Sequence, residues 1–95
     1  MTNYEVMFVI NPTLEDEAKN ATVETVKEII AADGEVGDVE TLGMKKLAYP
    51  ILKNTEGYYV LVNFKGNATL PKELDRRLRI SDNVLRHIII NKDEK

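Results

Sequence analysis

The stretch from Leu42 to Ile51 restricts the fold more than any other part of this sequence. It reads as a strand, carries the adjacent lysines Lys45 and Lys46, and contains Pro50 near its end. Proline lacks a backbone donor, so within sheets it is confined to edge strands, strand ends and bulges. We therefore expect an edge strand, on which the lysines could serve simply to prevent pairing with another chain.

The spacing of apolar residues predicts the other elements. Strict alternation is typical of a strand, and spacing by three or four is typical of a helix. By these criteria the order is strand, helix, strand, strand, helix, strand, with the ranges 4–10, 14–33, 36–47, 58–64, 70–80 and 85–91. We expect Thr13 and Thr69 to cap the helices and Gly34 to end the first one. Residues 53–57 are polar or glycine, which predicts a hairpin loop.

Two successive strand-helix-strand halves predict an α+β fold, the ferredoxin-like split βαβ sandwich. In it a four-stranded antiparallel sheet carries both helices on one face. The second and fourth strands are then the edges, in agreement with Pro50. We expect a single domain over residues 1–91 and a short charged tail, 92–95, that frays. The other face of the sheet is left open, and function is expected there or along its rims.

Charge and composition exclude several classes of protein. The net charge of −3 argues against a generic nucleic-acid binder. The first 50 residues hold four Lys against ten acidic residues, whereas the rest hold nine basic against six acidic residues, so a basic face remains possible. There is no Cys, and no apolar run is long enough to span a membrane. The simplest expectation is a cytoplasmic protein without membrane association.

The residues that catalysis needs are scarce in this chain. His87 and Ser81 are its only His and Ser, and no carboxylate is placed to orient His87. Small phosphatases of this fold bind an anion at the first strand-helix turn, but residues 11–13 contain neither a glycine run nor an Arg. We therefore expect no catalytic residue, no metal site and no cofactor.

RNA recognition is the next hypothesis, because RRM domains share this topology and stack bases on the third strand. Residues 57–64 nearly match that motif, but Glu56 precedes them and Val60 replaces the second stacking aromatic. Contacts to the RNA backbone fit the basic residues better. Those near the edges are Lys45, Lys46 and Lys53 on one side and Arg86, His87 and Lys92 on the other. Alternation places Lys45 and Lys46 on opposite faces.

The stretch Leu42-Gly43-x-Lys45-Lys46-Leu47-Ala48-Tyr49-Pro50-Ile51-x-Lys53, followed by Gly57-Tyr58-Tyr59, resembles the signature of bacterial small-subunit ribosomal protein six. The opening Tyr4-Glu5-Val6 with Asn11-Pro12 is similar to its first strand and turn. The residues from Leu78 to Arg86 are similar to its second helix end and fourth strand entry. The similarity runs along the whole chain in the same order.

This resemblance implies a structural protein of the ribosome with a ferredoxin-like fold. It implies binding of 16S ribosomal RNA together with ribosomal protein eighteen, as a heterodimer formed by a chain that is monomeric when free. The candidate RNA contacts are Lys45, Lys46, Lys53, Arg86, His87 and Lys92, and the candidate contacts to the protein partner are Tyr49, Tyr59 and Leu61. The alternative is a regulatory module that forms a homodimer through its sheet and binds a small ligand.

Overall fold

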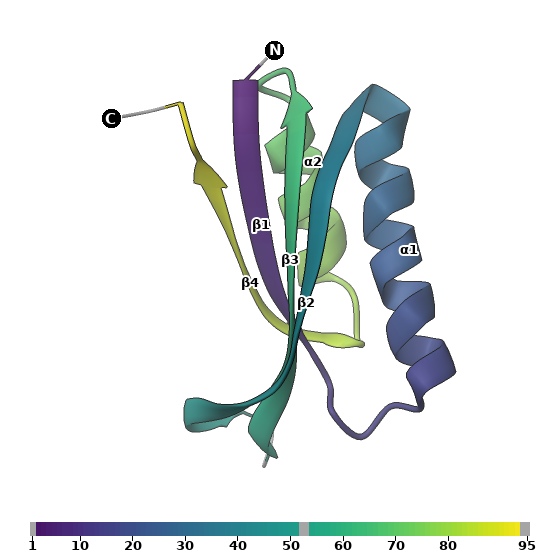
Figure 1. Ribbon diagram of the computed structural model, residues 1–95, viewed down its shortest axis with the longest axis vertical. Coiled ribbons are helices and arrows are strands. Elements are labelled where there is room, and N and C mark those ends of the chain that lie inside the picture. Colours follow the sequence, from purple (N-terminus) through teal and green to yellow (C-terminus); the bar gives the residue numbers. More distant parts are fainter. Residues whose placement is uncertain (1, 52–53, 94–95) are drawn as a thin grey trace.

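The computed structural model describes residues 2–51 and 54–93, without the side chains of 48–51. Along this part of the chain the elements are β1 (Thr2–Ile10), α1 (Asp16–Asp33), β2 (Gly34–Ile51), β3 (Asn54–Gly66), α2 (Leu70–Arg79) and β4 (Val84–Asn91). The strands form an antiparallel sheet in the order β2-β3-β1-β4. Both helices lie on one side of this sheet (Figure 1). The predicted ferredoxin-like sandwich is confirmed, with β2 and β4 at the edges.

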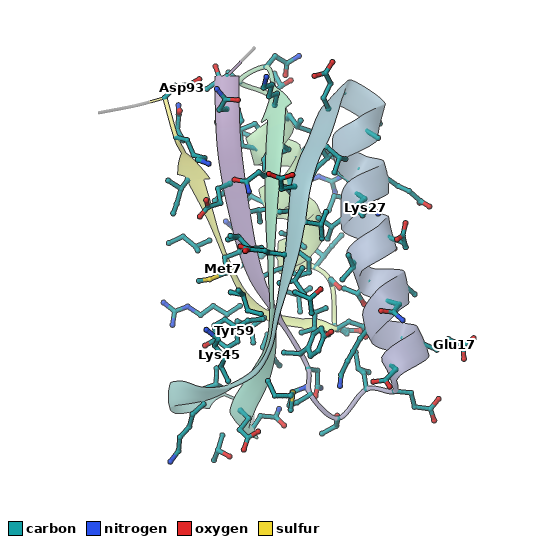
Figure 2. All side chains as sticks on the ribbon, in the orientation of Figure 1. Met7, Glu17, Lys27, Lys45, Tyr59 and Asp93 are labelled. Atoms are coloured by element: carbon teal, nitrogen blue, oxygen red, sulfur yellow. The ribbon has the colours of Figure 1, made fainter. Side chains whose placement is uncertain are left out.

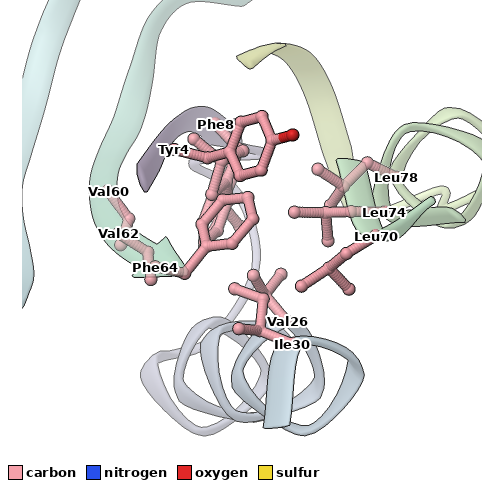
Figure 3. Close-up of a cluster of buried hydrophobic side chains, with 12 residues drawn as sticks. Tyr4, Phe8, Val26, Ile30, Val60, Val62, Phe64, Leu70, Leu74 and Leu78 are labelled. Carbon is pink, nitrogen blue, oxygen red and sulfur yellow. The ribbon is translucent and has the colours of Figure 1, made fainter. Parts of the chain in front are cut away.

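The core lies between the sheet and the two helices, as Figure 3 shows. Alternate residues of the central strands β1 and β3 point to the helices, and α1 and α2 each contribute one apolar stripe. The buried cluster consists of Tyr4, Val6, Phe8, Ile10, Val26, Ile30, Val60, Val62, Phe64, Leu70, Leu74 and Leu78. The rings of Tyr4 and Phe64 stack with their centroids 5.4 Å apart. The predicted stripe of α2 is thus confirmed.

The hairpin between β2 and β3 is longer than the sequence pattern suggests. A loop was expected at 53–57, but β3 already begins at Asn54, which pairs with Ile51 of β2. Gly57 is a strand residue, paired with Lys45, and it is glycine because a Cβ at this position would lie only 2.2 Å from Val9 Cγ1. The end of this hairpin extends beyond the other strands (Figure 1). The prediction of a loop is therefore wrong for residues 54–57.

Asparagines, rather than the expected threonines, organise the turns that enter the helices. Asn11 Oδ1 accepts hydrogen bonds from the backbone N–H and the hydroxyl of Thr13, at 3.0 and 2.8 Å. Asn67 Oδ1 accepts the same two bonds from Thr69 and a third from the N–H of Leu70. Neither helix has a side-chain hydrogen bond from its N-cap residue. The prediction is wrong for Thr13, because the N-cap residue of α1 is Glu15. Thr69 is the N-cap residue of α2 as predicted, but its hydroxyl makes no capping hydrogen bond and donates to Asn67 instead.

Gly34 follows α1 as expected, but for a different physical reason. Its φ of −161° is extended, so it does not end the helix in the left-handed conformation. A Cβ on Gly34 would lie 2.2 Å from the carbonyl oxygen of Lys65. The residue is therefore glycine because the start of β2 approaches β3 closely.

The first two residues after β4 are bonded to the start of β1. The N–H of Lys92 donates to the Asn3 carbonyl at 2.9 Å, and the N–H of Asn3 donates to Asp93 Oδ2 at 2.8 Å. The hydrogen bonds that Asp93 accepts from the backbone N–H and the side-chain amide of Asn3 hold its pKa below the ordinary value. The expectation that the tail frays is therefore wrong for Lys92 and Asp93, and residues 94–95 lie outside the described part of the chain.

Candidate protein and RNA interface

The sheet face opposite the helices carries a continuous apolar surface. The register places Met7 of β1 between Leu61 of β3 and Ile88 of β4, and residues opposite each other on antiparallel strands share a face. The pairs on either side of this one, Val9 with Tyr59 and Glu5 with Ile90, lie on the same face, and their apolar members complete the surface. We call the whole set the open-face patch, and it consists of Met7, Val9, Tyr59, Leu61, Ile88 and Ile90.

Exposure differs across the open-face patch. Val9 is only 3% exposed, whereas Ile88 and Ile90 are 47% and 46% exposed. The sequence prediction placed Tyr59 and Leu61 on this face, and the structure places both there, half-buried. It did not single out Met7, Ile88 or Ile90 as candidates. The sequence pattern could have indicated these three residues, because both β1 and the Ile run of β4 carry apolar side chains on both faces of the strand.

Three of the predicted cations lie on this same face. Arg86 pairs in register with Val9, and Lys45 pairs with Gly57, so both lie toward the hairpin end of the open-face patch. Figure 2 shows Lys45, Tyr59 and Met7 on the side of the sheet away from α1. Lys92 lies at the opposite end, where its Nζ is 3.0 Å from Asn63 Oδ1 and 3.9 Å from Glu5 Oε2. Positive charge thus borders the patch at the hairpin end, whereas at the opposite end the charge of Lys92 is paired with Glu5.

The other predicted site residues are not brought to this face. Lys46 pairs with Glu56 and lies on the helix side of the hairpin. His87 also points to the helix side, and its side chain is 15% exposed. The prediction for Lys53 falls outside the described residues, and for Tyr49 the structure describes the backbone but not the side chain.

His87 joins β4 to α2 through a short polar network. Its Nε2 is 2.6 Å from Asp75 Oδ1, and the other carboxylate oxygen, Oδ2, accepts a 2.6 Å hydrogen bond from Arg79. The hydrogen bond from His87, assisted by the charge of Arg79, holds the pKa of Asp75 below its ordinary value. The expectation that no carboxylate orients His87 is therefore wrong. A contact from His87 to RNA would have to compete with this network.

The arginines of α2 are paired with carboxylates of the same helix. Arg76 and Arg77 lie 2.7 and 3.4 Å from Glu73, and their pairing lowers the pKa of that carboxyl. The helix α1 carries five acidic residues and two lysines, which makes its solvent face acidic. A polyanion such as RNA is therefore better matched to the hairpin end of the open-face patch than to the helices.

Acid is expected to weaken the fold through Asp75, Asp93 and Glu73. Each has a folded-state pKa below its ordinary value, so its ionised form stabilises the fold. That contribution is present above the ordinary pKa of about 4 and is lost as pH falls through the folded-state pKa. The midpoint of urea unfolding should therefore decrease as pH falls below about 4.

Asp75→Asn tests this prediction directly. It should lower the urea midpoint near neutral pH and make the decline in acid shallower, because one of the linked carboxyls is gone. Glu28→Gln, which removes an exposed carboxylate of α1, is the charge-matched control. If the urea midpoint of Asp75→Asn declined in acid as much as that of the wild type, the contact between His87 and Asp75 would not contribute to the pH dependence of stability.

Neither metal ligation nor membrane insertion is supported by the described residues. Within residues 2–51 and 54–93, no cluster of three or more His, Cys, Asp or Glu side chains is arranged to hold a metal ion. Neither α1 nor α2 is long and apolar enough to cross a membrane. What the described face offers is a surface that is apolar in its centre and charged at its ends.

The fold and this surface define a ferredoxin-like domain with an uncovered sheet face. The model of the ribosomal protein S6 family matches residues 3–91. Small ribosomal subunit protein bS6 of Clostridioides difficile (strain 630) is 53% identical over 90 residues, which cover 95% of this chain and 98% of that protein. The bS6 protein of Clostridium acetobutylicum is 52% identical over 92 residues, 96% of this chain and 97% of that one.

A solved structure extends the similarity to three dimensions. The crystal structure of 30S ribosomal protein S6 from Thermotoga maritima has a TM-score of 0.91 to this chain at 33% identity, covering 97% of this chain and 88% of that one. The chain therefore belongs to the ribosomal protein S6 family, as the signature from Leu42 to Lys53 predicted. It is a structural protein of the small ribosomal subunit, located in the cytoplasm as part of the ribosome.

Proposed function

We propose that this chain binds 16S ribosomal RNA together with ribosomal protein eighteen, and that it is a monomer until this partner arrives. The observation that carries the proposal is the open-face patch. Neither helix covers it, and an apolar centre with a charged border is the composition of a protein interface. Membership of the ribosomal protein S6 family supports the choice of partner.

In this proposal the sheet face and the edge of β2 receive ribosomal protein eighteen. Tyr59 and Leu61 are the central contacts, because they lie beside Val9 and Met7 in adjacent rows of the sheet. Aromatic and large aliphatic side chains held by their neighbours lose little conformational freedom on binding. Tyr49 is the third proposed contact, and it lies near the end of the edge strand β2.

RNA is proposed to contact the basic residues through its phosphates. The candidates for these contacts are Lys45, Lys46, Lys53, Arg86, His87 and Lys92. A chain with net charge −3 has little long-range attraction for RNA by itself. A basic partner protein that shares the phosphate contacts would supply the missing charge, and the resulting affinity should depend strongly on salt.

Binding to a fragment of the 16S central domain, with and without ribosomal protein eighteen, tests the proposal. We expect tight binding, steeply reduced by salt, only when both proteins are present. Tight binding by this chain alone would contradict the need for a partner and assign the RNA contacts to its own basic residues. Absence of binding in both cases, together with a homodimer in solution, would overturn the proposal in favour of the regulatory module.

A further inference from the structure

A bulge in β2 controls which side chains of the following residues reach the open face. Thr41 pairs with Val60, but the next pair joins Gly43 to Tyr59. The chain therefore advances two residues along β2 for one along β3, and Leu42 is the extra residue. Gly43 has a φ of +83°, in the left-handed region that glycine enters without steric cost.

The bulge reverses the alternation of faces along β2. Before it, Thr41 is opposite the core residue Val60 and so lies on the helix side. After it, Lys45 is opposite Gly57, on the open face, and Lys46 is opposite Glu56, on the helix side. A strand that kept Leu42 in regular register, opposite Tyr59, would place the two lysines on the reverse faces, since side chains alternate with a period of two.

The surroundings of Gly57 confirm this assignment from a separate set of distances. A Cβ built on Gly57 would lie 2.2 Å from Val9 Cγ1 and 3.4 Å from Leu47 Cδ2. Val9 belongs to the open-face patch, and Leu47 is two residues from Lys45 on the same strand. The side chains of Leu47 and Lys45 therefore follow one face, the one that carries the patch.

We infer that Lys45, and not Lys46, contacts an RNA phosphate at the border of the open-face patch, and that Gly43 is the positioning residue that places it there. Lys45 pairs with Gly57, beyond the last pair of β1 and β3, which joins Ile10 to Tyr58. It therefore lies past the apolar centre, where the border of a protein interface meets solvent. This inference rests on the proposed binding of RNA and ribosomal protein eighteen.

Single substitutions separate the two lysines. In the complex with RNA and ribosomal protein eighteen, Lys45→Ala should make the plot of log affinity against log salt shallower by about 0.7 to 0.9, the loss of one phosphate contact. Lys46→Ala, the matched control on the adjacent residue, should leave the slope unchanged. Equal changes of the salt slope in the two variants would overturn the inference. It would also be overturned if Lys45→Ala weakened only the binding between the two proteins, measured without RNA. If the wild-type proteins do not bind RNA at all, the proposed function itself fails.

Substitutions at Gly43 test the positioning role by backbone conformation alone, because no atom lies within 4 Å of a Cβ built there. Asn enters the left-handed region readily and Val does not, so Gly43→Asn should keep the wild-type salt slope and Gly43→Val should lose it. In the Gly43→Val background, Lys45→Ala should cause no further change. A full additional effect of Lys45→Ala in that background would contradict the role of Gly43.

Deletion of Leu42 tests whether the pairing with β3, and not the extra residue itself, sets the face. Without Leu42, Gly43 follows Thr41 directly and can pair with Tyr59 in regular register, so Lys45 should stay opposite Gly57 on the open face. Adding Lys45→Ala should then make the salt slope shallower, whereas adding Lys46→Ala should not. Circular dichroism verifies that each variant is folded. If the deletion variant is unfolded, the Gly43→Asn and Gly43→Val pair decides the question alone, and a swapped sensitivity in a folded deletion variant would overturn the inference.

Discussion

Phe8→Ala is expected to destabilise the protein by about 3–5 kcal/mol, the range for deleting a large buried aromatic side chain. Phe8 is 0% exposed and lies on β1, between Val60 of β3 and His87 of β4. It therefore contacts the part of the core that both helices cover (Figure 3). For a domain of this size a loss of 1 kcal/mol lowers Tm by about 4–8 °C, so Tm should fall by at least about 12 °C.

Ile88→Ala is the matched control for Phe8→Ala. Ile88 also lies on the sheet next to β1, but it belongs to the open-face patch and is 47% exposed. Its replacement should cost about 1 kcal/mol or less, because much of the side chain already contacts water. Urea unfolding of the two variants measures both values. Equal costs would contradict the assignment of one face to the core and the other to binding.

The topology could be predicted because it depends on patterns that the chain carries locally. The period of two over 4–10 and the i, i+4 spacing of Leu70, Leu74 and Leu78 each identify an element from a few neighbouring residues. Pro50 identifies an edge, because its missing donor excludes a central strand. Short connections between such elements then leave few arrangements other than the observed sandwich.

The surface could be predicted only in part because its residues depend on partners far away in the sequence. The contact of His87 with Asp75 joins β4 to α2, and no local pattern indicates it. The face of Lys45 depends on an extra residue in β2, which appears only when β3 is paired beside it. Tyr59 and Leu61 were assigned to the correct face of the sheet, because β3 alternates without a bulge between them.

Replacing Tyr59 and Leu61 together by Ala is expected to weaken binding to ribosomal protein eighteen by roughly 100-fold or more, about 2.8 kcal/mol. The two side chains occupy adjacent rows of the open-face patch and are half-buried against Val9 and Met7 before any partner arrives. Their removal deletes the centre of the proposed interface, where the few residues that dominate binding are usually found. Isothermal titration calorimetry with purified ribosomal protein eighteen measures the change.

The matched control replaces Ile80 by Ala. This side chain is also apolar and is more exposed, at 67%, but it follows α2, away from the sheet face and from β2. Its loss should leave affinity for the partner unchanged. Equal weakening by the control and the double substitution would mean that the partner binds apolar surface without regard to face. A fall in Tm as large as that of Phe8→Ala would instead assign Tyr59 and Leu61 to the core, because residues held ready for a partner stabilise the free domain only weakly.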